Sequence, residues 1–322
     1  MVTLPSPFIL QQGIKMKFLV TGGTGTFGSA VVKYLLANTN DEIIVFSRDE
    51  TKQYLLKNEI SQNKRVQFVI GDVRDKNSMK KYFKDVDYVF HAAALKHIPA
   101  CQENPLQAIM TNIIGTSNVF DLAIENNVKK VIYLSTDKAV NPTSVMGMTK
   151  SIAEQIVKNN NSNTEFVITR FCNLAISQGS VIPLWISQIK QGKNITLTSE
   201  QMNRYFISTN DAVDLVIKAF QLGKQGEIFI KKAKQYNLKT IAESLIKIYD
   251  SNVKIDITGI RSGEKLNEQL FSPDEFAEEY DDFYILKGDK KVILPNYVED
   301  EATTITDVKN WLNDESKKLA LV

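Results

Sequence analysis

Short apolar runs alternate with segments of helical periodicity along the first two thirds of the chain. The runs lie at 16–20, 42–46, 66–70, 86–90, 130–134 and 165–169, and each is typical of a buried strand. Between them we predict helices, of which the longest are 105–125 and 144–158. This alternation predicts an α/β fold with a doubly wound parallel sheet, in which ligands gather at the carboxyl ends of the strands.

From Ser177 onward the pattern becomes mixed and predicts a smaller lobe. We expect short strands at 195–198, 205–208, 227–230 and 253–257, with helices at 180–191, 211–220, 238–249 and 305–312. The expected division is a leader at 1–15, a dinucleotide-binding domain at 16–176 to which 205–222 returns, a substrate lobe made of 177–204 and 223–290, and a C-terminal tail at 291–322.

The first predicted strand leads into a glycine-rich turn, Thr21-Gly-Gly-Thr-Gly-Thr-Phe-Gly28. Gly22 permits a tight turn, Gly25 lets backbone amides approach a pyrophosphate, and Gly28 lets the next helix pack close to the strand. The free N–H groups and the dipole of that helix favour a negative charge. The turn predicts a dinucleotide site, although an ordinary strand-to-helix connection can also carry such glycines.

The second predicted strand ends in Ser47 and Arg48, where a dinucleotide fold usually carries an acid for the ribose. A hydroxyl and a guanidinium suit a 2′-phosphate, so these residues favour NADP over NAD. Asp49 and Glu50 follow directly and leave NAD possible as the alternative.

Composition narrows the choice of partners. The chain has 322 residues, 43% hydrophobic and 24% charged, with a net charge of +2, so we expect a globular protein with neither nucleic acid nor a membrane as partner. Residues 1–15 lack the basic region and cleavage site of a signal peptide. Cys101 and Cys172 lack metal-ligand spacing and His91 and His97 are isolated, which indicates no metal site and fits a reducing, cytoplasmic location.

Polar residues appear where the strand at 130–134 ends. Ser135, Thr136, Asp137 and Lys138 follow it directly. On the next predicted helix, Met146 and Lys150 lie one turn apart on the same face. In the short-chain dehydrogenase/reductase superfamily the corresponding pair is Tyr and Lys, and the Tyr is the base. Met146 cannot act as that base because its side chain does not titrate.

Several motifs carry a resemblance that runs from Met16 to about Glu275. They are Thr21-Gly-Gly-Thr-Gly-Thr-Phe-Gly28, Phe46-Ser-Arg-Asp-Glu50, Gly71-Asp-Val-Arg-Asp75, His91-Ala-Ala-Ala-Leu-Lys-His97, Thr111-Asn-Ile-Ile-Gly-Thr116, Ser135-Thr-Asp-Lys-Ala139, Gly179-Ser-Val-Ile-Pro183 and Gly259-Ile-Arg-Ser-Gly-Glu-Lys265. With them the chain resembles the inverting UDP-N-acetylglucosamine 4,6-dehydratases, extended short-chain dehydrogenases with a Rossmann fold that also act as 5-epimerases. It is most similar to their capsule-type branch, which has Met in place of Tyr. Cys172 departs from the family pattern, which has Gly there.

The resemblance implies a role for each residue at the strand end. Lys138 is expected to be the base at sugar C5 and Asp137 the acid at the C6 hydroxyl. Thr136 is expected to bind the C4 hydroxyl, and Lys150 the nicotinamide ribose. Because Met146 cannot accept the C4 hydroxyl proton, we expect Lys138 to serve that step as well.

The resemblance also implies binding residues, with NADP as cofactor and UDP-N-acetylglucosamine as substrate. Residues expected at the cofactor are Gly22, Thr24, Gly25, Thr26, Phe27, Gly28, Ser47, Arg48, Asp72, Val73, Ala92, Ala93, Ala94 and Lys150. Residues expected at the substrate are Lys96, His97, Asn173, Val181, Arg204, Arg261 and Glu264. Asn112 is expected to be structural, tying adjacent strands near the strand at 130–134.

Two other functions and an assembly remain to be considered. A UDP-sugar 4-epimerase shares the fold but is expected to have Tyr at position 146, and it does not need the Asp137–Lys138 pair. A non-enzymatic NADP-binding regulator would explain the missing Tyr but not the retained lysines. The resemblance further implies a homo-oligomer, either a dimer or a hexamer of dimers, paired through the helices at 105–125 and 144–158.

Overall fold

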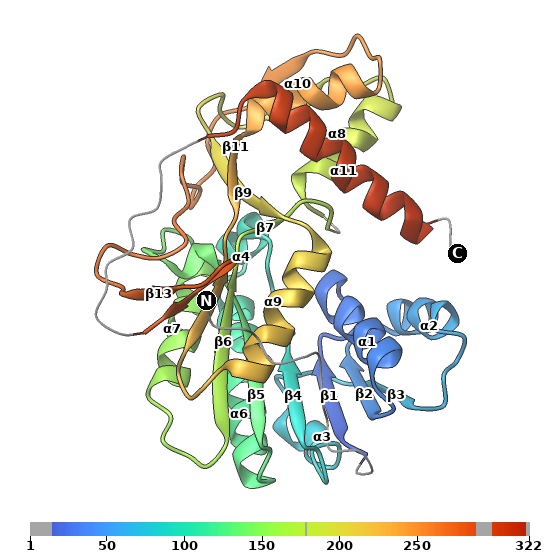
Figure 1. Cartoon of the computed structure of the whole chain (residues 1–322), viewed down its shortest axis with the longest axis vertical. Helices are drawn as coiled ribbons and strands as arrows, with labels where there is room; N and C mark the ends of the chain where they lie inside the picture. The colour runs from blue at the N-terminus through green and yellow to red at the C-terminus, as the bar shows by residue number, and fades with distance from the viewer. Residues whose placement is uncertain (1–14, 178, 288–297, 320–322) are drawn as a thin grey trace.

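A large sheet with helices on both faces carries a smaller lobe above it (Figure 1). This computed structural model describes residues 15–177, 179–287 and 298–319. The expected leader at 1–15, except for Lys15, and part of the expected tail lie outside the described residues. No helix in the described ranges combines the length and the apolar character needed to cross a membrane.

The large sheet has nine strands in the order β13-β14-β10-β6-β5-β4-β1-β2-β3. Their bounds are β1 Lys17–Thr21, β2 Glu42–Ser47, β3 Val66–Ile70, β4 Tyr88–His91, β5 Lys130–Thr136, β6 Glu165–Phe171, β10 Ile228–Lys231, β13 Ala277–Glu279 and β14 Phe283–Leu286. The strands from β3 to β10 are parallel, whereas β14 and β13 are antiparallel additions at one edge. The doubly wound α/β fold is therefore confirmed, with β1 to β6 within a few residues of the predicted runs.

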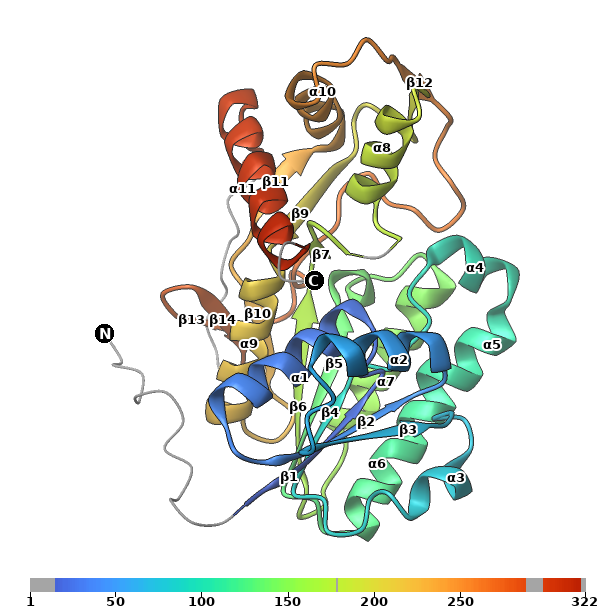
Figure 2. The ribbon, with the colours of Figure 1, turned by 90° about the vertical axis from the view of Figure 1, so that its right-hand side faces the viewer.

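Helices cover both faces of the sheet, which explains why its central strands read as continuous apolar runs. Their bounds are α1 Thr26–Asn38, α2 Glu50–Glu59, α3 Lys76–Lys80, α4 Ile98–Glu103, α5 Pro105–Ile109, α6 Gly115–Glu125, α7 Val145–Lys158 and α9 Thr209–Leu222. Figure 2 shows α1 and α9 on one side of the sheet and α6 on the other.

The predicted helix at 105–125 contains a π turn at Met110–Ile114, which joins α5 to α6. Asn112 in this turn donates to the Leu95 carbonyl (3.0 Å) and to Thr149 Oγ1 (3.0 Å), and it accepts from the Leu95 amide (2.8 Å). The π turn thus places one buried amide between the segment after β4 and helix α7, and not between adjacent strands as expected.

The smaller lobe has its own apolar core around Trp185, Ile241, Leu245 and Val308. Its elements are β7 Asn173–Leu174, β8 Ile195–Leu197, β9 Asn203–Ile207, β11 Lys234–Asn237, β12 Ile255–Ile257, α8 Val181–Lys190, α10 Leu238–Ile248 and α11 Glu301–Leu319. Strands β11, β9 and β7 form one sheet, and β12 pairs with β8.

Strands β7 and β9 take residues 173–174 and 205–207, which were expected in the dinucleotide-binding domain, into the sheet of the smaller lobe. Two later segments also differ from the expected division. Strands β10, β13 and β14 come from the segment 223–290 that was assigned to the smaller lobe, but they extend the large sheet. Helix α11 comes from the expected tail, but it packs on α10 and adds Val308 to the lobe's core. Both differences arise because these segments find apolar partners far away in the sequence.

Candidate active site

The carboxyl ends of β1, β2 and β4 surround a cavity of about 250 Å³. Predicted cofactor residues on its wall are Gly22, Thr24, Gly25, Ser47, Arg48, Val73, Ala92, Ala93 and Ala94. Phe46, Asp49, Lys52, Gly71 and Thr111 complete the lining. The cavity lies where a doubly wound sheet binds dinucleotides, beside the strand at which the chain order reverses.

The glycine turn fits a phosphate. Gly22 has a φ of +65°, and a Cβ there would lie 2.7 Å from the carbonyl carbon of Ala92, so only glycine suits this position. Helix α1 begins after Gly25 without a side-chain cap. Its first amides are therefore available to an anion, and the residues present fit the diphosphate of a dinucleotide.

Positive charge gathers where β2 ends. Arg48 and Lys52 both line the cavity, and Arg48 Nη1 lies 3.5 Å from Asp72 Oδ2. Partial burial acts to raise the pKa of Asp72, but hydrogen bonds from Arg74 and the charge of Arg48 outweigh it and lower that pKa. Ser47 Oγ accepts a hydrogen bond from Gln53 (2.9 Å). Lys52 was not predicted, although its place one turn after Arg48 is a signal that could have identified it.

Other predicted cofactor residues lie outside the lining of this cavity. Phe27 packs against Phe171, with ring centroids 5.1 Å apart. Thr26 lines a separate cavity between α1 and α9, and Gly28 lies inside α1. These three residues shape the helix start.

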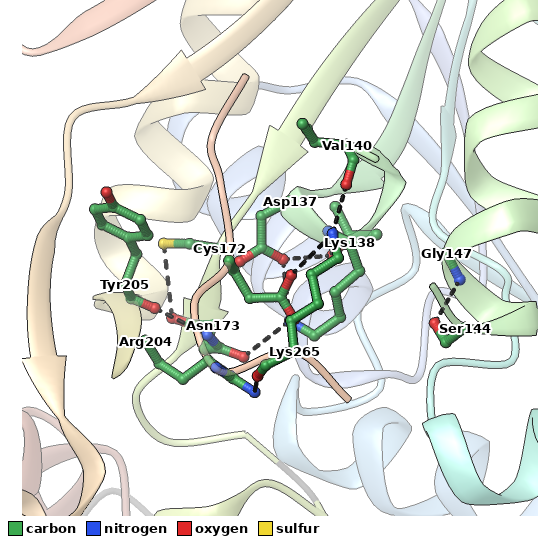
Figure 3. Close-up of polar contacts among 12 residues, drawn as sticks. Asp137, Lys138, Val140, Ser144, Gly147, Cys172, Asn173, Arg204, Tyr205 and Lys265 are labelled. Atoms are coloured by element: carbon green, nitrogen blue, oxygen red, sulfur yellow. Dashed lines mark hydrogen bonds and ion pairs between the residues drawn. The ribbon is translucent and has the colours of Figure 1, made fainter. Parts of the chain in front are cut away.

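The end of β5 holds a compact polar group (Figure 3). Asp137 is fully buried, and its Oδ1 accepts from Thr136 Oγ1 (2.9 Å) and from Lys138 Nζ (3.0 Å). Its Oδ2 has no hydrogen-bond partner among the described residues. Lys138 Nζ also donates to Asn173 Oδ1 (3.2 Å). The predicted acid and base are therefore in direct contact, with one carboxylate oxygen left unsatisfied.

Helix α7 presses closely on this turn. A Cβ at Gly147 would lie 2.2 Å from the carbonyl oxygen of Lys138, so glycine permits the approach. One residue earlier, Met146 is buried in a small apolar cluster with Cys101 and Ala108. Met146 thus contributes packing rather than a titratable group.

Lys150 lies beneath the same helix, almost fully buried. Its Nζ donates to the Leu134 carbonyl (2.6 Å) and lies 4.7 Å from the centroid of the Tyr133 ring. Burial lowers the pKa of Lys150 to about 8, although Glu154 acts in the opposite direction. The residue therefore still carries its charge at neutral pH.

A buried ionic network supports the end of β5 from below. Arg170 on β6 pairs with Glu154 on α7 (2.7 Å) and with Glu275 (2.8 Å), and Ser135 Oγ donates to Glu154 (2.5 Å). Burial acts to lower the pKa of Arg170, but the two carboxylates outweigh it and raise that pKa.

The predicted substrate residues fall into two groups. Asn173 lies beside Lys138, and its Nδ2 donates to the Tyr205 carbonyl (3.0 Å). Arg204 is buried and donates to the backbone carbonyls of Asn203, Lys265 and Leu266, so in this structure it supports the 265–266 backbone. Figure 3 shows Arg204 and Asn173 near Lys138 and Lys265.

The second group lies nearer the surface. Arg261 is exposed, and its amide donates to Glu264 Oε2 (3.0 Å). The His97 ring lies against the backbone of Gly179. Desolvation and the charge of Lys52 lower the pKa of Lys96. Val181 begins α8. Of the predicted set, Asn173 contacts the Asp137–Lys138 pair through its hydrogen bond from Lys138 Nζ.

Glu268 is a buried residue of this site that the sequence did not reveal. Its Oε1 lies 4.0 Å from Lys138 Nζ, and its Oε2 lies 3.6 Å from Lys265 Nζ. The residue sits in a segment without helical or strand periodicity, so its burial could not be predicted.

Comparison with known proteins gives consistent results. The sequence profile described as "Polysaccharide biosynthesis protein" matches residues 18–287. A protein of Rickettsia bellii named UDP-glucose 4-epimerase is 42% identical over 315 residues, covering 94% of this chain and 92% of the relative. The protein of the same name from Rickettsia akari is 43% identical over 329 residues, covering 94% of each chain.

Two solved structures extend the comparison. Pen from Bacillus thuringiensis is 34% identical with a TM-score of 0.89, covering 92% of this chain and 98% of that one. DesIV, a dTDP-glucose 4,6-dehydratase from Streptomyces venezuelae with NAD and TYD bound, is 23% identical with a TM-score of 0.73 over 78% and 87% of the two chains, which supports the fold alone.

Proposed function

The chain belongs to the polysaccharide biosynthesis protein family, a group of extended short-chain dehydrogenases that modify nucleotide sugars, and within it we propose a specific reaction. The protein removes water from UDP-N-acetylglucosamine across C5 and C6 and inverts C5, giving UDP-2-acetamido-2,6-dideoxy-β-L-arabino-hex-4-ulose. The observation that carries this proposal is the contact between Lys138 and the buried Asp137 at the end of β5, next to a buried Met146. Elimination needs a base and an acid side by side, and this pair supplies both.

Each residue at the end of β5 has a task in this reaction. Lys138 Nζ takes the proton of the C4 hydroxyl as C4 is oxidised, releases it to solvent, and then takes the proton from sugar C5. Asp137 gives a proton to the departing C6 hydroxyl, which leaves as water. Thr136 Oγ1 binds the C4 hydroxyl, and the charged Lys150 orients the nicotinamide ribose. NADP, when bound, supplies the oxidation of C4 and the later reduction at C6. A proton from solvent then adds to C5 from the face opposite Lys138, which completes the inversion, and Lys138 releases its proton to solvent.

A UDP-sugar 4-epimerase is the second candidate, because relatives more than 40% identical carry the name UDP-glucose 4-epimerase. That reaction needs a base for the C4 hydroxyl and no acid at C6. Met146 offers no such base, and if Lys138 acts as that base the reaction still leaves the buried Asp137 without a role. A non-enzymatic NADP-binding regulator would need neither residue.

Incubation of the purified protein with UDP-N-acetylglucosamine and NADP separates the three functions. We expect loss of one water from the nucleotide sugar, measured by mass spectrometry. Unchanged mass with altered configuration at C4 would instead identify an epimerase, and unchanged substrate a regulator. Incubation with UDP-glucose in parallel serves as the control for substrate choice.

Substitutions at the pair should separate proton abstraction from water loss. Lys138→Met is expected to abolish both oxidation at C4 and exchange of the C5 hydrogen with solvent deuterium, because one base serves both steps. Asp137→Asn is expected to retain C5 exchange but to lose dehydration by at least about 100-fold. Oxidation at C4 in a single turnover of Lys138→Met would assign the first step to another base, with Asp137 and Lys96 as the next candidates. Met146→Tyr, which changes a packing residue, is the matched variant and should remain active.

The cofactor is proposed to be NADP, since Ser47, Arg48 and Lys52 line the cavity where β2 ends. Arg48→Asp should weaken NADP binding by about 1.5–3 kcal/mol, the usual value of a hydrogen bond to a charged group, and weaken NAD binding far less. Lys57→Asp on the exposed side of α2 is the control with the same charge change. Equal losses for both dinucleotides in calorimetric titrations would show that Arg48 does not bind the 2′-phosphate.

The protein is also proposed to form a two-fold dimer through α5, the π turn and α7. Exposed apolar side chains gather there: Leu106, Ile109, Met110, Ile114, Met148 and Ile152. An interface of this kind is self-complementary and apolar. Ile152→Asp should convert the dimer into a monomer in light scattering at micromolar concentration, whereas Leu184→Asp, an exposed apolar site on α8, should not. A monomeric wild-type protein would contradict the assembly.

A further inference from the structure

Glu268 is a carboxylate buried where water cannot satisfy it. The residue is 4% exposed, and its Oε2 has no hydrogen-bond partner among the described residues. An unsatisfied buried carboxylate oxygen costs stability. The place of this carboxylate beside Lys138 therefore calls for an explanation.

The polar and charged groups around Lys138 come from three segments. On its own turn lies Asp137, with Oδ1 at 3.0 Å. From the end of β6 come the Asn173 amide at 3.2 Å and the Cys172 thiol, whose pKa is raised by burial first and by Asp137 second. The 265–268 segment brings Glu268 at 4.0 Å and, on the far side of Glu268, Lys265.

Lys265 has a hydrogen bond of its own in addition to its contact with Glu268. Its Nζ donates to the Val140 carbonyl (2.6 Å) and lies 3.6 Å from Glu268 Oε2. Glu268 therefore lies between two ammonium groups, one on the turn after β5 and one on its own segment. This arrangement keeps the Glu268 carboxylate within 4.0 Å of the ammonium groups of Lys138 and Lys265.

We infer that Glu268 is a positioning residue that holds the Lys138 ammonium in place and stabilises it as a cation. This inference rests on the proposed function, in which Asp137 carries a proton for the C6 hydroxyl. With Asp137 neutral, Glu268 is the remaining anion within 4.0 Å of Lys138 Nζ among the described residues. It is then the counter-charge for the proton that Lys138 takes from C5.

Two charge-changing variants of opposite sign test this inference. Glu268→Gln keeps the shape of the side chain and removes a negative charge, so the reactive neutral amine of Lys138 should become more populated. Lys265→Met removes a positive charge, so Glu268 no longer shares its negative charge with Lys265. The neutral amine form of Lys138 should therefore become less populated. The readout is the rate at which an acylating reagent labels Lys138 at pH 8, followed by peptide mass spectrometry.

We expect labelling of Lys138 to rise by about tenfold or more in Glu268→Gln, in line with the effect of an opposite charge within 4–6 Å. In Lys265→Met it should fall by about twofold or more. Glu268→Asp keeps the charge and should label within about twofold of the wild type. Glu279→Gln, which removes an exposed carboxylate paired with Lys232, is the matched control and should label as the wild type does.

The kinetics of water loss give the second readout. Glu268→Gln should lower kcat about tenfold with KM within about twofold, because a misplaced base affects the reaction more than binding. Glu268→Asp should recover part of that loss.

Unchanged labelling of Lys138 in both Glu268→Gln and Lys265→Met would overturn the inference, as would a Glu268→Gln variant with normal kcat. If Glu268→Gln fails to fold, the labelling change in Lys265→Met decides alone. If the wild type does not remove water from UDP-N-acetylglucosamine, the proposed function fails, and the labelling rates still decide whether Glu268 controls the charge of Lys138.

Discussion

The buried contact of Arg170 with Glu154 and Glu275 holds the site together. It joins β6, α7 and the segment before β13, and Ser135 on β5 adds a hydrogen bond. Burying the Arg170–Glu154 pair is costly, and loss of one partner from a buried pair typically costs about 3–5 kcal/mol. A network that lacked one partner would therefore destabilise the fold. The complete network fixes α7 and the end of β5 relative to each other. Lys150 and Asp137 depend on that fixed geometry.

Above this network the site spans two parts of the molecule. The cavity beside the glycine turn is built on the ends of β1, β2 and β4, while Asp137 and Lys138, the proposed proton-transfer groups, lie at the end of β5. The smaller lobe reaches the same place through its 263–269 segment, where Gly263 accepts from Thr143 (3.1 Å) and Gln269 accepts from Asn141 (2.9 Å). A sugar bound between these parts would touch both, so the two cores need a fixed relative position.

Much of this arrangement could be predicted because it is local in the sequence. The apolar runs located β1 to β6, the glycine turn located the cavity, and the residues after β5 located the Asp137–Lys138 pair. Contacts between distant segments could not be predicted. The pairing of β10 with β6, the packing of α11 on α10 and the position of Glu268 depend on partners far away in the chain. The hydrogen-bond partners of Arg204 could not be predicted for the same reason. Its charge suggested a phosphate ligand, whereas in the structure it donates to backbone carbonyls of the 265–266 segment.

The π turn at Met110–Ile114 restricts how the length of this protein can change. One extra residue in a helix turns everything beyond it by about 100°, and here that rotation sets the direction of Asn112 relative to the apolar side chains of α5. Removing a residue to restore a regular helix would turn either the Asn112 amide away from Leu95 or those apolar side chains away from their present face. Substitutions can therefore accumulate along 105–125, but insertions and deletions should be confined to the loops that flank it.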